Sequence, residues 1–121
     1  MNESELLVDH KSKFQGRCCT LTNRTKIDEI LQNLLENDKR VRKASHPHMY
    51  AWRIGATEQG SSDNGENGAG QRLLTLLHQA NVVNVLVIVT RWYGGIPLGS
   101  SRFRHISSTA VASLKKGGFL P

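Results

Sequence analysis

One segment, 84–90 (NVLVIVT), constrains the fold of this chain more than any other. Apolar side chains occupy both its odd and its even positions, and successive residues of a strand point to opposite faces of a sheet. A strand of this composition needs cover on both faces and belongs in the middle of a sheet. The longest apolar run, 82–89, contains Asn84 and is far shorter than the ~20 residues of a membrane helix, so we expect no membrane association.

Around this segment, strand and helix patterns alternate. Strands are expected where β-branched and aromatic residues gather between turn residues, and helices where apolar residues recur every three or four positions. The expected strands are 6–8, 13–22, 48–55 and 84–90, and the expected helices are 25–43, 70–80 and 100–116. Within 48–55 we expect Tyr50, Trp52 and Ile54 to face the core. The glycine-rich segment 56–70 is expected to be a loop without regular structure.

Length and charge fit one small basic domain. The chain has 121 residues, with 16 Lys and Arg against 10 Asp and Glu, which gives a net charge of +6. A chain of this length buries enough surface for a single core, so we expect one domain over 1–121. The positive charge suits nucleic acid, ribosomal or acidic protein partners, but it equally suits ordinary solubility.

Residues for catalysis or metal binding are sparse. The adjacent Cys18 and Cys19 suit neither a disulfide framework nor a zinc site, and none of the five His residues has zinc-ligand spacing. Neither glycine-rich segment contains a P-loop or a GxGxxG motif. We therefore expect no catalytic residue, no metal and no cofactor, and the unpaired cysteines indicate a reducing compartment, cytoplasmic or nuclear.

One edge of the sheet is the candidate site. Only 81–83 join the helix at 70–80 to the strand at 84–90, so the two run antiparallel and the helix begins beside the end of the strand. The second glycine-rich segment, 93–101, starts at that same end. Helix N-termini attract anions, and arginines add charge-assisted hydrogen bonds. The candidate partner-binding or anion-binding residues are Asp63, Glu66, Arg91, Trp92, Tyr93, Gly94, Gly95, Arg102 and Arg104.

The same residues also permit a closed arrangement. Asp63 and Glu66 can cap helix N–H groups or pair with Arg91 and Arg102, and this would make the edge a polar network satisfied by the chain itself. The glycines then serve the backbone turn and not a ligand. From the sequence, an open binding site and a closed network stand as equal alternatives.

Two segments resemble the Impact N-terminal domain family, which includes eukaryotic Impact and bacterial YigZ-type proteins. They are 61–77 (SSDNGENGAGQRLLTLL) and 91–106 (RWYGGIPLGSSRFRHI), and Lys11–Gly16 and Tyr50–Gly55 are similar too, so the resemblance covers nearly the whole chain. Asn64 stands where an aspartate is usual. The chain resembles the core that these proteins share, and we expect it to lack the additional domain of either group.

The resemblance implies a fold and a role. The implied fold is an α/β (α+β) two-layer sandwich similar to the second domain of ribosomal protein S-five, with a mixed sheet and helices on one face. The implied role is non-enzymatic: Impact-like proteins bind the ribosome-associated activator of the amino-acid-starvation kinase and restrain phosphorylation of initiation factor two alpha, and some contact actin.

We therefore expect a regulatory protein-binding domain linked to translation control. The surfaces expected to bind are Arg91, Tyr93 and Arg102 at the glycine edge and the helix at 25–43, because exposed arginine and aromatic residues dominate binding surfaces. The alternative is direct binding of nucleic acid or the ribosome through a basic surface.

Overall fold

The apolar segment singled out above lies in the middle of the sheet. In the computed structural model, which describes residues 1–121, the strand β6 (Val85–Trp92) pairs with β3 (Ser12–Thr20) on one side and with β4 (His46–Ile54) on the other. The edges are β5 (Glu58–Ser62), which pairs with β4, and the short strands β1 (Asn2–Glu3) and β2 (Leu7–Asp9), which both pair with β3. Every one of these pairings is antiparallel.

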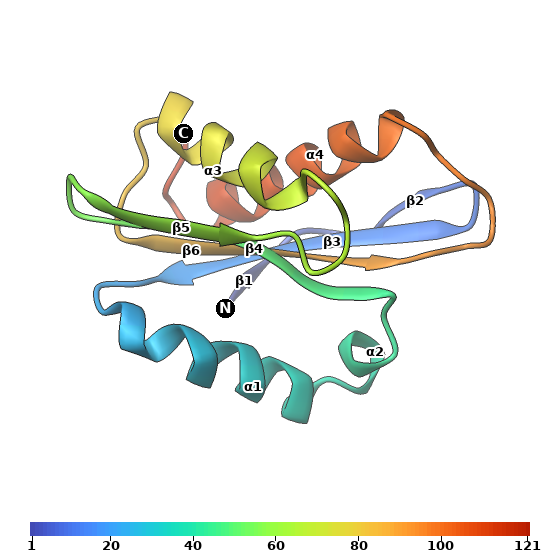
Figure 1. Ribbon diagram of the computed structural model, residues 1–121, viewed down its shortest axis with the longest axis horizontal. Coiled ribbons are helices and arrows are strands. Elements are labelled where there is room, and N and C mark those ends of the chain that lie inside the picture. The colour runs from blue at the N-terminus through green and yellow to red at the C-terminus, as the bar shows by residue number, and fades with distance from the viewer.

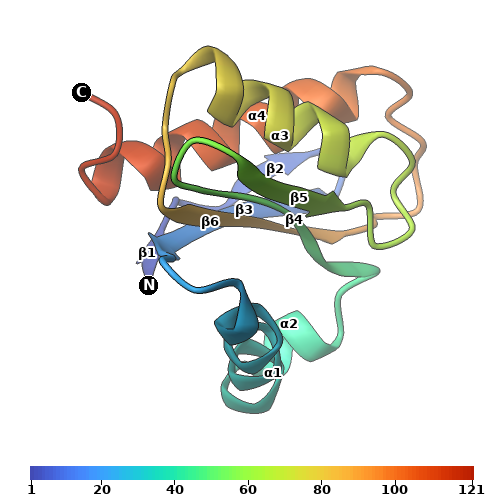
Figure 2. The same cartoon turned by 60° about the vertical axis from the view of Figure 1, so that its left-hand side comes forward.

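Helices cover both faces of this sheet (Figures 1 and 2). One face carries α3 (Ala69–Gln79) and α4 (Ser101–Lys116), and the other carries α1 (Ile27–Asn37) and α2 (Lys39–Arg42). The strand β6 supplies both sides, with Val85, Val87 and Val89 in the larger core under α3 and α4. Leu86 and Ile88 lie in the smaller core under α1.

The α+β class is confirmed, but two details of the expected fold are wrong. The sheet is antiparallel and not mixed, and helices cover two faces and not one (Figure 2). The physical reason is β6 itself: a two-layer sandwich would leave Leu86 and Ile88, which are fully buried here, in contact with water.

The expected helix at 25–43 is divided at Asp38. This residue adopts an extended conformation, with φ −129° and ψ 105°, and its Oδ1 accepts hydrogen bonds from the backbone N–H groups of Arg40 and Val41. An aspartate in this conformation is a helix N-cap, so it ends α1 and begins α2. The chain enters α1 through a single 3₁₀ turn, η1 (Arg24–Lys26), which Asn23 caps.

One expectation for the 48–62 region is wrong, and another is met on the smaller core. The segment 56–70 contains a strand, β5, because an edge strand needs only backbone hydrogen bonds to one neighbour and can be entirely polar. The missed strand lies at the edge of the sheet, where burial is incomplete. In β4 both faces are covered: Met49 and Ala51 lie in the larger core with α3. As expected, Ile54 faces a core, the smaller one under α1, and the partly buried Tyr50 and Trp52 pack against that core.

Gly16 allows β3 and α4 to approach each other closely. A methyl group at this position would overlap the backbone carbonyl of Thr109 and lie 2.9 Å from the backbone nitrogen of Ala110. We expect Gly16→Ala to lower the free energy of unfolding by about 2–3 kcal/mol, the usual cost of overpacking. Urea denaturation followed by circular dichroism measures this.

Gly55→Ala is the matched control for that variant. Gly55 has φ +58° but open space around it, so only backbone strain of about 1 kcal/mol is expected. An equal or smaller loss for Gly16→Ala would show that the approach of β3 to α4 does not limit stability.

Candidate functional site

The two glycine-rich segments meet at Glu66, as the antiparallel argument predicts. Its Oε2 accepts a hydrogen bond from Nη1 of Arg91 at 2.7 Å, and its Oε1 accepts one from Nε of Arg102 at 2.7 Å. Glu66 and Arg91 are only 7% and 4% exposed. The Arg91 guanidinium also lies 5.2 Å from the ring centre of Phe14 and 5.4 Å from that of Tyr93. We call this group the Glu66 cluster, defined by Glu66, Arg91 and Arg102.

The Glu66 carboxylate is held in its charged form. Burial is the largest influence on it and favours the neutral acid, because a buried carboxylate loses its hydration. The hydrogen bonds from Arg91 and Arg102 and the charge of Arg91 outweigh burial, so the net pKa of Glu66 lies below that of an ordinary glutamate. His46 contributes too, with its Nε2 3.6 Å from Oε2 of Glu66.

Asp63 occupies the start of α3. Its Oδ1 accepts from the backbone N–H of Gly70 at 2.8 Å, and its Oδ2 accepts from that of Gly68 at 3.1 Å. The free N–H groups that attract anions to a helix N-terminus are thus bonded to the chain's own carboxylate. Together with the Glu66 cluster, this engages the carboxylates of the edge within the chain, while Nε of Arg91 is buried without a hydrogen-bond partner.

The glycines after β6 shape the backbone. A methyl group at Gly94 would overlap the carbonyl group of Lys11, and the Gly94 N–H donates to Oγ of Ser12 at 3.1 Å. Gly95 has φ +89°, a conformation that other residues rarely adopt. Both positions therefore require glycine for conformation or space, in agreement with the structural role that the sequence suggests.

Of the other three candidates, Trp92 and Arg104 lie apart from the Glu66 cluster, and Tyr93 lies over it. Alternate residues of a strand face opposite ways, so Trp92 lies on the α1 and α2 face while Arg91 lies on the α3 and α4 face. The Trp92 Nε1–H donates to the backbone oxygen of Arg40 at 2.7 Å. Tyr93 is 48% exposed over the Arg91 guanidinium, and Arg104 is exposed on α4 without a side-chain hydrogen bond or ion pair. The nine candidates therefore do not form one site.

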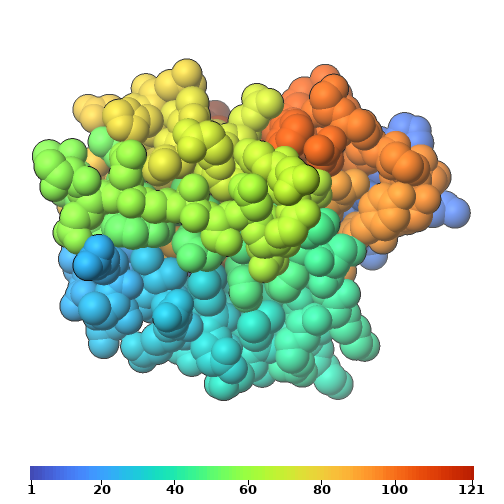
Figure 3. All heavy atoms as spheres, in the orientation of Figure 1, coloured from blue at the N-terminus to red at the C-terminus, as the bar shows by residue number.

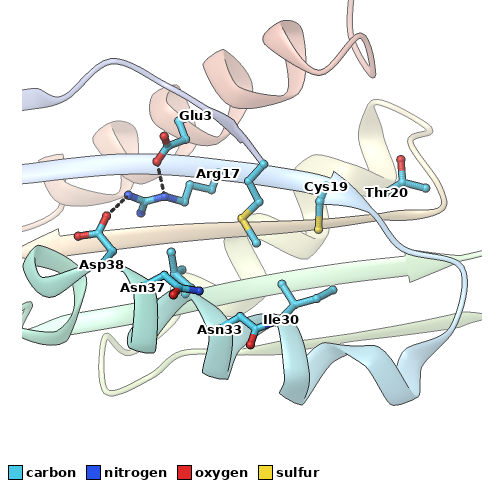
Figure 4. Close-up of a pocket in the computed structure, with 10 residues that line it drawn as sticks. Glu3, Arg17, Cys19, Thr20, Ile30, Asn33, Asn37 and Asp38 are labelled. Carbon is cyan, nitrogen blue, oxygen red and sulfur yellow. Dashed lines mark hydrogen bonds and ion pairs between the residues drawn. The ribbon is translucent and has the colours of Figure 1, made fainter.

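A second charged cluster, which the sequence analysis missed, lies on the α1 and α2 face (Figure 4). It is centred on Arg17 of β3, which is 1% exposed. Its Nε donates to Oε2 of Glu3 at 2.7 Å and its Nη2 to Oδ2 of Asp38 at 3.3 Å. Further bonds go from Nη1 to Oγ1 of Thr90 and from Nη2 to Oε1 of Gln15. The only available signal was one arginine among small and apolar residues in KFQGRCCT.

Arg17 borders a pocket of about 620 Å³ between the sheet and α1, shown in Figure 4. Cys19 also lines it, and burial raises the pKa of the Cys19 thiol, so the reactive thiolate is scarce at neutral pH. Arg17 is bonded to the chain itself. The pocket thus offers neither an activated nucleophile nor a free guanidinium.

The structure contains no group of three or more His, Cys, Asp and Glu side chains arranged to hold a metal ion. None of its helices combines the length and the apolar character needed to cross a membrane.

A model of the Impact N-terminal domain matches residues 10–114, from the turn before β3 to the last turns of α4. The match includes both charged clusters apart from Glu3. The chain belongs to the Impact N-terminal domain family. The resemblance seen in the glycine-rich segments is therefore confirmed over most of the chain.

Relatives within the Impact family differ in length. The chain is 54% identical to the IMPACT family member YDL177C of Saccharomyces cerevisiae, in an alignment covering 99% of this chain and 93% of the relative. It is 40% identical to the IMPACT homolog of the same yeast and to IMPACT-B of Xenopus tropicalis, but covers only 46% and 38% of those proteins. The chain thus spans less than half the length of these two IMPACT proteins.

Two solved structures share the fold. One is the two-domain translational regulator Yih1, with 38% identity and a TM-score of 0.63 over 94% of this chain and 45% of that one. The other is described as a hypothetical protein, with a TM-score of 0.80 over 96% of this chain and 62% of that one. Its identity of 22% supports the fold alone.

We expect Glu66→Gln to destabilise this Impact domain at neutral pH by about 3 kcal/mol, because the buried arginines lose their anionic partner. The pKa of Glu66 is lowered in the folded state, so the charge of Glu66 stabilises the fold above the ordinary glutamate pKa of about 4.3. That contribution is lost as the pH falls through the lower folded pKa. The difference between wild type and Glu66→Gln should therefore shrink in acid, as measured by urea denaturation between pH 7 and pH 3.

Glu58→Gln is the control, since Glu58 is half exposed and lies 4.0 Å from Arg24. An exposed pair of this kind contributes about 0.5 kcal/mol or less. A Glu66→Gln loss that is equally small, or that does not change with pH, would contradict the role given to the Glu66 cluster.

Proposed function

We propose that this Impact domain is a non-enzymatic regulator of translation that acts by binding a protein partner. The observation that carries the proposal is the likeness to Yih1, a translational regulator that is 38% identical over 94% of this chain. The match to the Impact N-terminal domain, residues 10–114, includes every residue of the two charged clusters of this chain except Glu3. Such a role places the domain in the cytoplasm, and also in the nucleus if its partner enters the nucleus.

The proposed partner is the ribosome-associated activator of the amino-acid-starvation kinase, the protein that Impact-like proteins bind. Occupying the activator displaces the kinase, which lowers phosphorylation of initiation factor two alpha. Monomeric actin, which some Impact-like proteins contact, is a further candidate partner.

The state of the charged side chains favours binding over catalysis. A general acid or base must be free to exchange a proton near neutral pH, whereas Glu66 is fixed as an anion by Arg91 and Arg102. Asp63 is engaged with the start of α3. These groups stiffen the glycine edge and do not act as reagents.

The proposed contact surface at this edge is the segment after β6. Tyr93 and Ile96 are 48% and 41% exposed, and aromatic side chains are prominent among residues that dominate binding energy. Arg91 lies against the Tyr93 ring, and Arg102 connects the start of α4 to Glu66. The two arginines therefore support this surface from behind, and the exposed apolar side chains make the contact.

A pull-down from cytosolic lysate tests the function. Tagged wild-type domain, treated with nuclease at low and moderate salt, should capture the kinase activator, identified by immunoblot. Tyr93→Ala/Ile96→Ala should lose most of this capture without losing stability. Expression of wild-type domain in amino-acid-starved cells should lower phosphorylation of initiation factor two alpha, and the double variant should not.

Val8→Ala is the control for loss of exposed apolar surface, because Val8 is also an exposed apolar side chain, 61% accessible on the edge strand β2 and outside the segment after β6. It should capture the activator like wild type. Recovery of only nuclease-sensitive ribosomal material would instead favour direct binding of nucleic acid or the ribosome.

A further inference from the structure

A basic pocket surrounds Trp92 on the α1 and α2 face of the sheet. Its volume is about 420 Å³, within the range of about 300–1,000 Å³ typical of ligand sites. In Figure 3 the segment after β6 (orange) lies next to the chain that leads from α2 into β4 (teal-green). We call it the Trp92 pocket, and its lining residues are Leu6, Lys11, Lys13, Arg40, Lys43 and Trp92.

Three parts of the fold position these side chains. Lys13 lies opposite Trp92 in the β3–β6 register, so both project to the same face. The Trp92 Nε1–H bond of 2.7 Å to the Arg40 backbone oxygen fixes the indole against α2, and Asp38 fixes α2 by capping it. The site is therefore built on strands and a capped helix, a rigid support for recognition.

The charge of the Trp92 pocket is not balanced within the chain. Four of its lining residues are cationic and none is acidic. Lys11, Lys13 and Lys43 form no ion pair, and Arg40 has only a carboxylate of Asp38 at 3.6 Å from its Nε. In contrast, Arg17, Arg91 and Arg102 all pair with carboxylates at 2.7 Å. Neighbouring like charges repel, so an anionic occupant would be favoured here.

The apolar part of the pocket indicates what else the occupant carries. Leu6 is 43% exposed and Trp92 is partly exposed, and together with the lysine stems they form an apolar surface within the basic rim. Apolar contacts surrounded by polar ones are the usual organisation of a protein-binding surface. A free anion such as phosphate would use the rim and leave this surface in water.

We propose that the Trp92 pocket binds a short acidic segment of a partner protein and takes one apolar side chain of that segment between Leu6 and Trp92. The proposal rests on the proposed protein-binding function and adds the chemistry of the partner segment. The 25–43 region is expected to bind a partner, and the proposal assigns that contact to Arg40 and Lys43 at the end of the region.

A peptide fits this pocket better than a nucleic acid. Single-stranded nucleic acid is bound by successive aromatic rings along a basic groove, whereas the pocket has one aromatic ring, Trp92, with its N–H already bonded to Arg40. The cations surround a single pocket and do not follow a track. Nucleic acid is therefore the competing outcome of the test.

The test is an NMR titration of the full ¹⁵N-labelled chain with a blocked nonapeptide of eight glutamates around a central phenylalanine. We expect saturable shifts of the Trp92 indole N–H and of the Lys13 and Lys43 amides. Lys13→Glu/Lys43→Glu should raise the dissociation constant of the peptide at least tenfold. Replacing the phenylalanine of the peptide by glycine should raise the dissociation constant at least fivefold.

Arg104→Glu/Lys115→Glu is the matched control, because it makes the same change in charge at two exposed positions of α4 on the opposite face. It should leave the dissociation constant within twofold. Lys11→Gln/Lys43→Gln removes two positive charges and adds no negative ones. It should also weaken peptide binding, and it keeps the test possible if the glutamate variant does not fold.

Three results would overturn the proposal: no saturable shifts, equal weakening by the α4 control, or tighter binding of a uridine nonamer than of the peptide at the same residues. These results are separate from a failure of the proposed function. If the activator is captured by wild type but the peptide does not bind the Trp92 pocket, this inference alone is wrong. If the peptide binds and the activator is not captured, the pocket is supported and the proposed partner is wrong.

Discussion

The need to cover β6 on both faces determines the rest of this structure. Leu86 and Ile88 require α1 on one side, and Val85, Val87 and Val89 require α3 and α4 on the other. A central strand with antiparallel neighbours on both sides also fixes where its end lies, and the segments that follow β6 and precede α3 meet there. The position of the glycine edge is thus a consequence of core packing.

The alternation of β6 also divides the polar chemistry between the two faces. Arg91 and Trp92 are adjacent in the sequence, yet Arg91 joins Glu66 on one face and Trp92 joins Arg40 on the other. Each face holds one buried arginine paired with carboxylates, Arg91 above the sheet and Arg17 below it. An unpaired buried charge is very costly, so both guanidinium groups have a carboxylate partner within the chain before any other protein binds.

The sequence predicted the positions of the helices and strands better than it predicted which faces of the sheet the helices cover. Periodicity located every long helix and strand, because apolar spacing directly reflects burial. It missed β5, since backbone pairing at an edge leaves no apolar pattern. The meeting of Glu66 with Arg91 and Arg102 followed from chain direction alone. The choice between a closed network and an open site depended on hydrogen-bond geometry, and the Arg17 cluster depended on Glu3 and Asp38, which are distant in sequence.

In this Impact domain, the paired charges hold the fold in place, and the unpaired charges are the ones proposed to contact a partner. The carboxylates of Glu66, Asp63 and Asp38 each accept hydrogen bonds from the chain, and these bonds hold the glycine edge and α2 in place. The lysines at 11, 13 and 43 have no such partner, although Asp38 orders the helix beside them. The chain engages its buried arginines with carboxylates or, for Arg53, with the backbone oxygens of Leu77 and Val82, whereas exposure permits charges without a partner. The unpaired set around Trp92 is consequently a part of the surface where an anionic partner lowers the electrostatic energy.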